Sequence, residues 1–484
     1  MSHNIEQSSS SEVLGGRSFP TANGALADVP IRDLPDPQPL RRVLGPGVIA
    51  AGVGLASGEF VLWPYISANV GLVFLWAMFV GVTLQFFINM EIERYTLATG
   101  ETALTGFSRS WRHWGLVFAI MAALANMWPG WATSSATVLT FAIGGGNAVL
   151  IAIIELVVIG LVLTLSPVVY QSVEQIQFAK VIAVVIFMLV ALFLVITRDA
   201  YSALPDVVTN VGQVPTELGF ALVLGALAFA GGGGAQNLVQ SNWIRDKNMG
   251  MGARIPRLVS PITGEDQAAP STGFLFDPND ANLRRWRGWW KVANTEQLVS
   301  FVAITAFTIT VTSLLAFSTV FGQDVANDVA FLQTEADVLN ERTGWFGTFF
   351  LWIGAVSLFA AALGILDYVG RLVADVLKVN YLADSQRWTE SRIYTTVVWS
   401  LIALGTIILL AGLDQPLVLL VIAAVLGGFM MFVYSILLIQ LNRKALPRAI
   451  ELRGYRLAVM GFVILFFGFF SALILIEQVQ KLFA

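Results

Sequence analysis

A single carboxylate interrupts the first long apolar stretch of the sequence. Glu59 follows Ser57 and Gly58 within residues 43–68, which carry no other charged side chain. A charge at the centre of a membrane helix costs at least ~2.5 kcal/mol, so an intramembrane acid usually has a function. Glu59 is therefore a candidate ligand for a cation. The alternative is a protonated carboxyl group that is hydrogen-bonded between helices.

A second apolar stretch is interrupted by the glycine-rich segment FAGGGGAQN, residues 229–237. Where a membrane helix unwinds, one half-helix ends in free carbonyl groups and the next begins with free N–H groups. Together with Glu59, Gln236 and Asn237, these carbonyls form a set of donors that are nearly all oxygen. Such donors suit a hard cation such as Mg²⁺, Ca²⁺, Mn²⁺ or Na⁺, or the ammonium group of a small organic solute. Close helix packing is the alternative role of the glycines.

Two further acids are candidates for binding a coupling ion, either a proton or sodium. Glu155 lies in an otherwise apolar stretch, and its alternative role is that of a neutral, hydrogen-bonded helix contact. Asp367 precedes Arg371 by four residues, a spacing that favours an ion pair along one helix face.

The composition indicates which class of protein must position these groups. Of the 484 residues, 56% are hydrophobic and only 12% are charged, whereas soluble domains have about 25% charged residues. The sequence is therefore typical of a polytopic membrane protein. It has no cysteine and only two histidines, so we expect neither an enzyme nor a bound cofactor. The basic, aromatic segment at 284–290 favours contact with membrane lipid over nucleic acid.

Eleven stretches with few charges are long enough to span the membrane. They lie near residues 44–68, 70–92, 115–143, 147–167, 173–196, 217–244, 292–320, 345–368, 393–412, 415–441 and 456–478. With a cytoplasmic N-terminus, only Arg198, Arg342 and Lys481 among the 28 Lys and Arg residues fall outside the cytoplasmic loops and helix ends. The positive-inside rule thus predicts a multi-pass protein of the cell membrane, with the C-terminus on the opposite side.

The two interrupted stretches are the first and sixth spans, at corresponding places in two successive groups of five. Because five is odd, the groups have opposite orientations, and paired broken helices in inverted halves are typical of secondary transporters. The predicted organisation is a disordered cytoplasmic tail at 1–42 and a transmembrane domain at 43–480, with a first repeat at 43–197, a second repeat at 216–442, an extra helix at 455–480 and a cytoplasmic loop at 246–290.

The segment LGPGVIAAGVGLASGEF resembles the first helix of the natural resistance-associated macrophage protein (Nramp) family of divalent-metal transporters. The family's Asp-Pro-Gly-Asn motif, counted from Gly45, falls on residues 56–59, which read Ala-Ser-Gly-Glu here. The segment GAQNLVQSNW resembles the family's sixth-helix Met-Pro-His-Asn-Leu, which falls on residues 234–238. The resemblance implies an all-α, leucine-transporter-type fold of the APC superfamily, with two inverted five-helix repeats and broken helices 1 and 6.

The departures from the family concern its metal ligands. Ala56 stands at the position of the family's Asp, Gly234 at that of its Met, and Gln236 at that of its His. The resemblance implies a substrate site at Ala56, Ser57, Gly58, Glu59, Ala230, Gly231, Gly234, Gln236 and Asn237, with Glu59 and Asn237 as metal ligands. Because the sulfur ligand is missing, we expect alternating-access transport of a hard cation of the Mg²⁺ or Mn²⁺ type rather than a soft metal. A transporter of a small organic solute such as an amino acid is the alternative.

Overall fold

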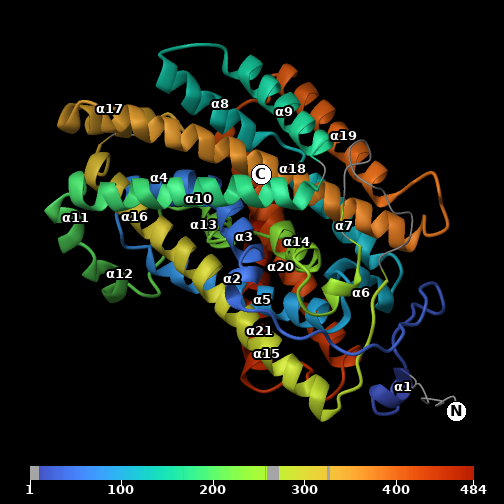
Figure 1. Ribbon diagram of the computed structural model, residues 1–484. Helices are drawn as coiled ribbons and strands as arrows, with labels where there is room; N and C mark the ends of the chain where they lie inside the picture. The colour runs from blue at the N-terminus through green and yellow to red at the C-terminus, as the bar shows by residue number, and fades with distance from the viewer. Residues whose placement is uncertain (1–9, 167, 257, 259–271, 324–327, 484) are drawn as a thin grey trace, which may run out of the picture.

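The computed structural model describes residues 10–166, 168–256, 258, 272–323 and 328–483, and these residues form a bundle of helices (Figure 1). The first half of the chain contains α1 (Ser10–Val13), α2 (Leu40–Val43), α3 (Pro46–Gly54), the π-helix η1 (Ser57–Leu62), α4 (Trp63–Val70), α5 (Trp76–Thr99), α6 (Ala103–Ser110), α7 (Trp114–Asn126), α8 (Gly130–Ile143), α9 (Ala148–Leu165), α10 (Val169–Leu194), α11 (Arg198–Ser202) and α12 (Pro205–Thr209).

The second half begins with the short helices of the second interrupted stretch and ends with long ones. It contains α13 (Phe220–Ala228), α14 (Ala235–Asp246), the 3₁₀-helix η2 (Gly250–Arg254), α15 (Asp280–Glu296), the π-helix η3 (Gln297–Val302), α16 (Ala303–Thr319), α17 (Phe331–Thr343), α18 (Phe346–Asn380), α19 (Glu390–Leu410), α20 (Pro416–Lys444) and α21 (Tyr455–Phe483).

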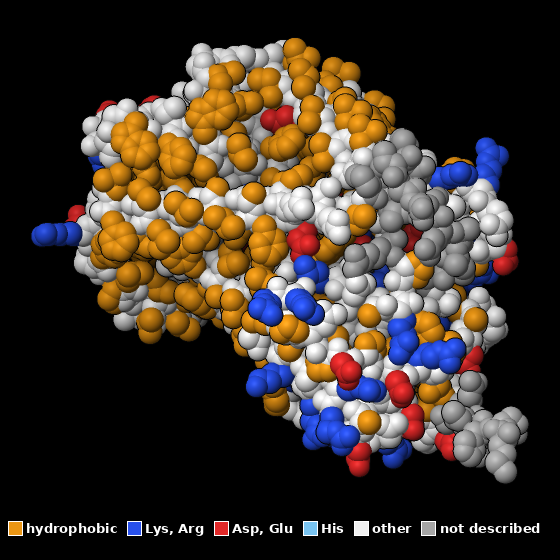
Figure 2. Space-filling model, in the orientation of Figure 1, with side chains coloured by type: hydrophobic (Ala, Val, Ile, Leu, Met, Phe, Trp, Pro, Cys, Tyr) orange, Lys and Arg blue, Asp and Glu red, His pale blue; other side chains and the backbone are white. Residues whose placement is uncertain are grey.

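Nine helical stretches in the described part of the chain are long and apolar enough to cross a membrane. Hydrophobic side chains cover the surface over α8, α9 and α10, whereas charged side chains gather near α15 and the N-terminal segment (Figure 2). The protein is therefore an all-α, multi-pass membrane protein, as predicted. The predicted spans at 70–92 and 217–244 are not among the nine, because α5 carries charged residues in its last turns and because α13 and α14 are separate short helices.

Helix α5 extends to Thr99, past the predicted end of its span at 92. The charges in these last turns are partly paired, because Glu91 forms ion pairs with Arg94 at 2.6 Å and with Arg456 at 3.3 Å. Helix α18 lies beside both interrupted helices, since it contacts α3 and α14 as well as α8 and α10. These contacts hold the two interruptions in the middle of the bundle.

Both predicted helix breaks are present. Between α3 and η1, Leu55 and Ala56 are not helical, and the backbone of Ala56 has φ −159° and ψ −81°. Between α13 and α14, Gly231, Gly233 and Gly234 have φ values of 128°, 75° and 57°, in the left-handed region that favours glycine. A third break separates α7 from α8, in the predicted span 115–143, where a proline at position 129 cannot donate a helical hydrogen bond.

The described part of the N-terminal segment, residues 10–42, differs from the predicted disordered tail. Leu14, Phe19 and Leu34 are buried, and backbone carbonyls of the segment accept hydrogen bonds from Arg109 and Trp289. A few apolar residues spaced along a polar segment thus anchor it to the bundle. The composition of the segment alone had concealed these anchors.

Candidate functional site

The two interrupted helices touch each other at their breaks. A Cβ atom added to Gly54 would collide with the carbonyl oxygen of Gly231, and one added to Gly58 would collide with that of Phe229. The glycines therefore allow two unwound backbones to lie in direct contact. Close packing and a broken helix, which the sequence left as alternatives, occur together here.

Glu59 lies at this contact and is fully buried. Its Oε2 atom accepts a hydrogen bond from the hydroxyl of Thr308 on α16, and its Oε1 atom has no hydrogen-bond partner among the described residues. The hydroxyl of Thr305 lies near the carboxylate and interacts with it, although it makes no well-formed hydrogen bond within the described part of the chain. The carboxylate therefore points toward oxygen donors of α16, and one of its own oxygens is left to bind a ligand.

A buried cation lies close to this carboxylate. Lys180 on α10 donates a 2.5 Å hydrogen bond from Nζ to the carbonyl oxygen of Gly52 in the last turns of α3. The positive charge of Lys180 attracts Glu59 electrostatically, although the two side chains do not form an ion pair. Sequence reasoning assigned Lys180 only to a cytoplasmic helix end. The structure places it at the first break, bonded to α3 and near Glu59.

The second break is held by one amide side chain. Gln85 on α5 donates from Nε2 to the carbonyl oxygens of residues 227, 228 and 230, at 3.2, 2.8 and 3.0 Å. Its Oε1 atom accepts from the backbone N–H groups of Gly232 and Gly233, at 2.8 and 3.1 Å. Sequence reasoning missed Gln85, although an amide in an apolar stretch was an available signal.

The predicted residues of α14 have partners on other helices. Gln236 donates a 2.5 Å hydrogen bond to the carbonyl oxygen of Ala50 on α3, so that this pair joins the two breaks. Asn237 instead donates to Asn89 on α5, at 2.7 Å, and accepts from Tyr434 on α20, at 3.4 Å.

The predicted metal ligands Glu59 and Asn237 therefore share no hydrogen-bond partner within the described part of the chain. No group of three or more His, Cys, Asp or Glu side chains that could hold a metal ion occurs in the described ranges. Amide and hydroxyl oxygens would have to complete any cation site at the breaks.

The two candidate acids for a coupling ion have different surroundings. Glu155 is bonded to the hydroxyl of Ser135 at 3.0 Å and lines an apolar groove of about 260 Å³ on the outside of the bundle, beside Trp352. Asp367 accepts two hydrogen bonds from Arg371, at 2.9 and 2.8 Å, which is the pair that the four-residue spacing indicated. Arg371 also bonds to Asp246 of α14 and thereby ties α18 to the second broken helix.

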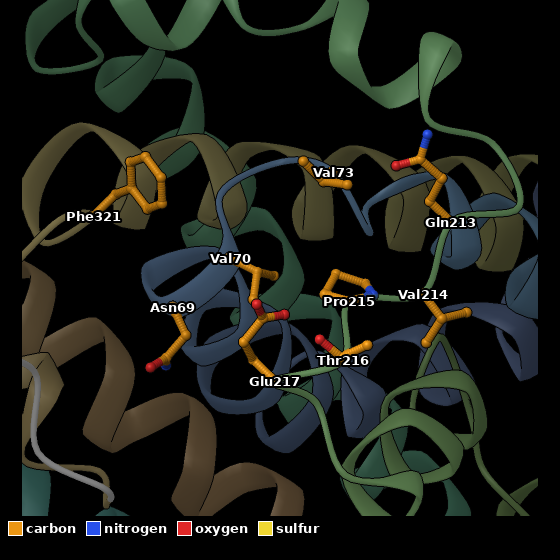
Figure 3. A pocket seen from close by; sticks show the side chains of 9 residues that line it. All are labelled: Asn69, Val70, Val73, Gln213, Val214, Pro215, Thr216, Glu217 and Phe321. Atoms are coloured by element: carbon orange, nitrogen blue, oxygen red, sulfur yellow. The ribbon is translucent and has the colours of Figure 1, made fainter.

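A pocket of about 470 Å³ lies beyond the last residues of α4. The segment that precedes α13 forms its other wall, so the pocket is at the ends of these two elements that are farther from the breaks. Asn69, Glu217 and Phe321 are among the residues that line it, and the side chains of Asn69 and Glu217 lie next to Val70 (Figure 3). Glu59 and Val70 are eleven positions apart, which corresponds to about 16 Å along a helix. Both helices that border the pocket therefore lead directly to the breaks.

These features describe a multi-pass helical protein in which two interrupted helices meet at a buried acid, an arrangement found in secondary transporters. The structure of the Eremococcus coleocola manganese transporter in complex with an aromatic bis-isothiourea substituted compound has a similar fold. Its TM-score is 0.68 at 12% sequence identity, over 92% of this chain and 88% of that chain. A mutant of the same transporter gives a TM-score of 0.67, also at 12% identity and over the same shares.

The structure of MhsT in complex with L-phenylalanine is a more distant neighbour, with a TM-score of 0.50 at 12% identity over 89% of this chain and 97% of that chain. At such low identity these similarities concern the fold alone. The sequence matches no known protein family and no curated protein.

Proposed function

We propose that the protein is a secondary-active transporter that moves a hard divalent cation, of the Mg²⁺ or Mn²⁺ type, by alternating access. The observation that carries this proposal is the unpartnered Oε1 atom of Glu59, fully buried where the two broken helices meet. A buried carboxylate oxygen without a donor is costly unless a cation or a proton binds it. The hydroxyl of Thr305, which lies near this carboxylate, supplies a second oxygen atom at the same place.

Other features favour a hard divalent cation over a soft transition metal. Gly234 stands where the resemblance to Nramp transporters places a methionine, so that position supplies no sulfur ligand. The remaining donors are oxygens, which Mg²⁺ and Mn²⁺ prefer. The fold shared with a manganese transporter is consistent with this cargo.

A small organic solute such as an amino acid is the second candidate. Side-chain N–H groups of Gln85, Gln236 and Lys180 already bind carbonyl oxygens near the breaks. Those carbonyls are the ligands that a bare metal ion would otherwise use. An organic substrate needs fewer of them, because its ammonium group can pair with Glu59 directly.

The same proposal includes the membrane arrangement. We infer eleven spans in two inverted five-helix repeats, with α13 and α14 together forming one span and α5 another. The N-terminus is then cytoplasmic, the pocket beside Glu217 is the outer vestibule, and bilayer lipid surrounds the apolar belt. Glu155 and Asp367 stay candidates for coupling to protons or sodium, and the outer groove at Glu155 suits a proton better than a hydrated ion.

Uptake into proteoliposomes tests the function. Mg²⁺, Mn²⁺, Ca²⁺, Cd²⁺ and a set of amino acids are offered in turn to the wild type, to Glu59→Gln and to Glu335→Gln. Glu335 is an equally buried acid on α17, away from the breaks, so its variant controls for the loss of any buried carboxylate. We expect uptake of hard divalent cations that only Glu59→Gln abolishes. Uptake of an amino acid without any metal would favour the second candidate.

A further inference from the structure

Helix α5 carries a stripe of polar residues below the second break. Gln85, Asn89 and Glu93 follow one another at intervals of four residues, so they lie on one face of the helix. This face packs against α14, α15 and η3. Each member of the stripe is bonded to α13, the α13–α14 break or α14: Gln85 holds the break, Asn89 accepts from Asn237, and Glu93 accepts from Gln240 at 3.3 Å.

The stripe continues by hydrogen bonds into the last residues of α15 and on to the beginning of α3. Asn89 donates to Gln297 at 3.2 Å, and Gln297 donates to Oε2 of Glu296 at 3.1 Å. The Oε1 atom of Glu296 accepts from the backbone N–H groups of Gly45 and Gly47, at 3.2 and 2.9 Å. A connected chain of buried polar groups therefore links the second break with the first residues of α3.

Two acids of this region are not balanced by cations. Glu93 and Glu296 are each 1% exposed, and neither forms an ion pair with any described residue. The nearby basic side chains are already paired: Arg94 with Glu91 at 2.6 Å, and Lys247 with Glu174 at 2.5 Å. The charge of Glu296 repels that of Glu93. Glu296 is stabilised by the N–H groups at the start of α3, whereas Glu93 accepts only from Gln240 in the described part of the chain. Ionising Glu93 beside Glu296 is therefore unfavourable unless a cation binds it.

Two oxygen atoms at this place have no hydrogen-bond partner among the described residues. They are Oε2 of Glu93 and Oε1 of Gln240, and Gln240 is 0% exposed. The amide of Gln240 is held next to Glu93 by its own donation to the carboxylate. A carboxylate oxygen and an amide oxygen, both buried and both unpartnered, are typical ligands of a hard cation.

We propose that Glu93 and Gln240 form a second cation site, about 12 Å along α5 from the level of Gln85, and that the nearby charge of Glu296 makes this site more attractive to a cation. The site takes a hard divalent cation on its way between the breaks and the other end of α3. One carboxylate oxygen and one amide oxygen leave coordination positions for water, which suits Mg²⁺ and Mn²⁺. The inference rests on the proposed function for the identity of the ion. The polar stripe of α5 then forms part of the path along which the cation moves.

Equilibrium binding of radioactive Mn²⁺ to the purified protein in lipid nanodiscs tests the second site, with Mg²⁺ as competitor. We expect two ions per wild-type chain, one in Glu93→Gln, one in Glu59→Gln and none in the double variant. Gln240→Leu should weaken Mn²⁺ binding at the second site about tenfold, because it removes one oxygen that contacts the ion. Mn²⁺ binding at the Glu59 site should be unchanged. Glu335→Gln is the matched control and should still bind two.

The outcomes separate the two proposals. One ion per chain that is lost in Glu59→Gln but kept in both Glu93→Gln and Gln240→Leu would overturn the second site and leave the proposed function intact. One ion that is lost in Glu93→Gln alone would support the second site and contradict the assignment of Glu59. No bound Mn²⁺ or Mg²⁺ in the wild type would overturn both. If Glu93→Gln fails to fold, the Mn²⁺ affinity of Gln240→Leu by itself decides whether the second site exists.

Discussion

Replacing Gln85 by leucine should destabilise the protein far more than an ordinary buried substitution. The two side chains have similar size, so little packing is lost. The change removes every side-chain hydrogen bond that Gln85 makes to the backbone between Leu227 and Gly233. The N–H and carbonyl groups of this unwound segment are buried and cannot turn to solvent.

The magnitude follows from the number of groups left without a partner. A carboxamide has two N–H donors and two good acceptor positions, so at most four of its contacts are full hydrogen bonds. Each buried group that loses its partner costs ~1–3 kcal/mol. The free energy of unfolding should therefore fall by at least ~4 kcal/mol, a large fraction of the stability of a typical domain.

The matched control is Gln177→Leu. Gln177 is also a buried glutamine within a span, but it makes a single hydrogen bond, from Nε2 to the carbonyl oxygen of Ala360 at 2.8 Å. Its Oε1 atom has no partner in the described part of the chain, so leucine also removes an existing penalty. We expect only a small change in melting temperature for this variant.

Melting temperatures of both variants, measured in the same detergent by loss of monodisperse protein on heating, provide the test. Equal losses in Gln85→Leu and Gln177→Leu would refute the reasoning. That result would mean that the backbone groups of the second break find other partners, such as water or a bound ion, and that Gln85 does not hold the break open.

Three further predictions concern other parts of the chain. Burial raises the pKa of Glu335 to about 8, above the unfolded value of about 4.5. The contribution of the protonated Glu335 to the free energy of unfolding is therefore complete below pH 4.5 and is lost as the pH rises through 8. Melting temperatures of Glu335→Gln should lack this decline, and parallel pH profiles for variant and wild type would contradict it. Gly234→Met should lower the yield of folded protein, because residue 234 has φ +57° and a Cβ there would collide with Gly427; a normal melting temperature would show that this close contact is dispensable. Single cysteines at Val208 and Asp36, which are 75% and 82% exposed, should react with membrane-impermeant reagents from outside and inside respectively, and reaction of both from one side would refute the topology.

Several properties of the protein follow from the sequence alone. Long apolar stretches can be stable only in a membrane, where every backbone polar group must bond within the chain, and so the all-α class was predictable. The two helix breaks were also predictable, because glycine runs and an isolated acid are unfavourable in an intact span. The pair between Asp367 and Arg371 depends only on the helical repeat, and it is present as the spacing indicated.

The partners of the candidate site residues depended on how distant helices pack. Periodicity tells which face of α5 carries Gln85, Asn89 and Glu93, but not that this face meets the second break and the end of α15. For the same reason the sequence could not show that Lys180 donates to the carbonyl of Gly52, nor that Glu59 faces Thr308 while Asn237 faces Asn89. Side-chain contacts between helices are set by rotation and crossing of the packed helices, which a single sequence does not contain. The acid and the two breaks were therefore evident from the residues, whereas the groups that satisfy and orient them were decided by the tertiary structure.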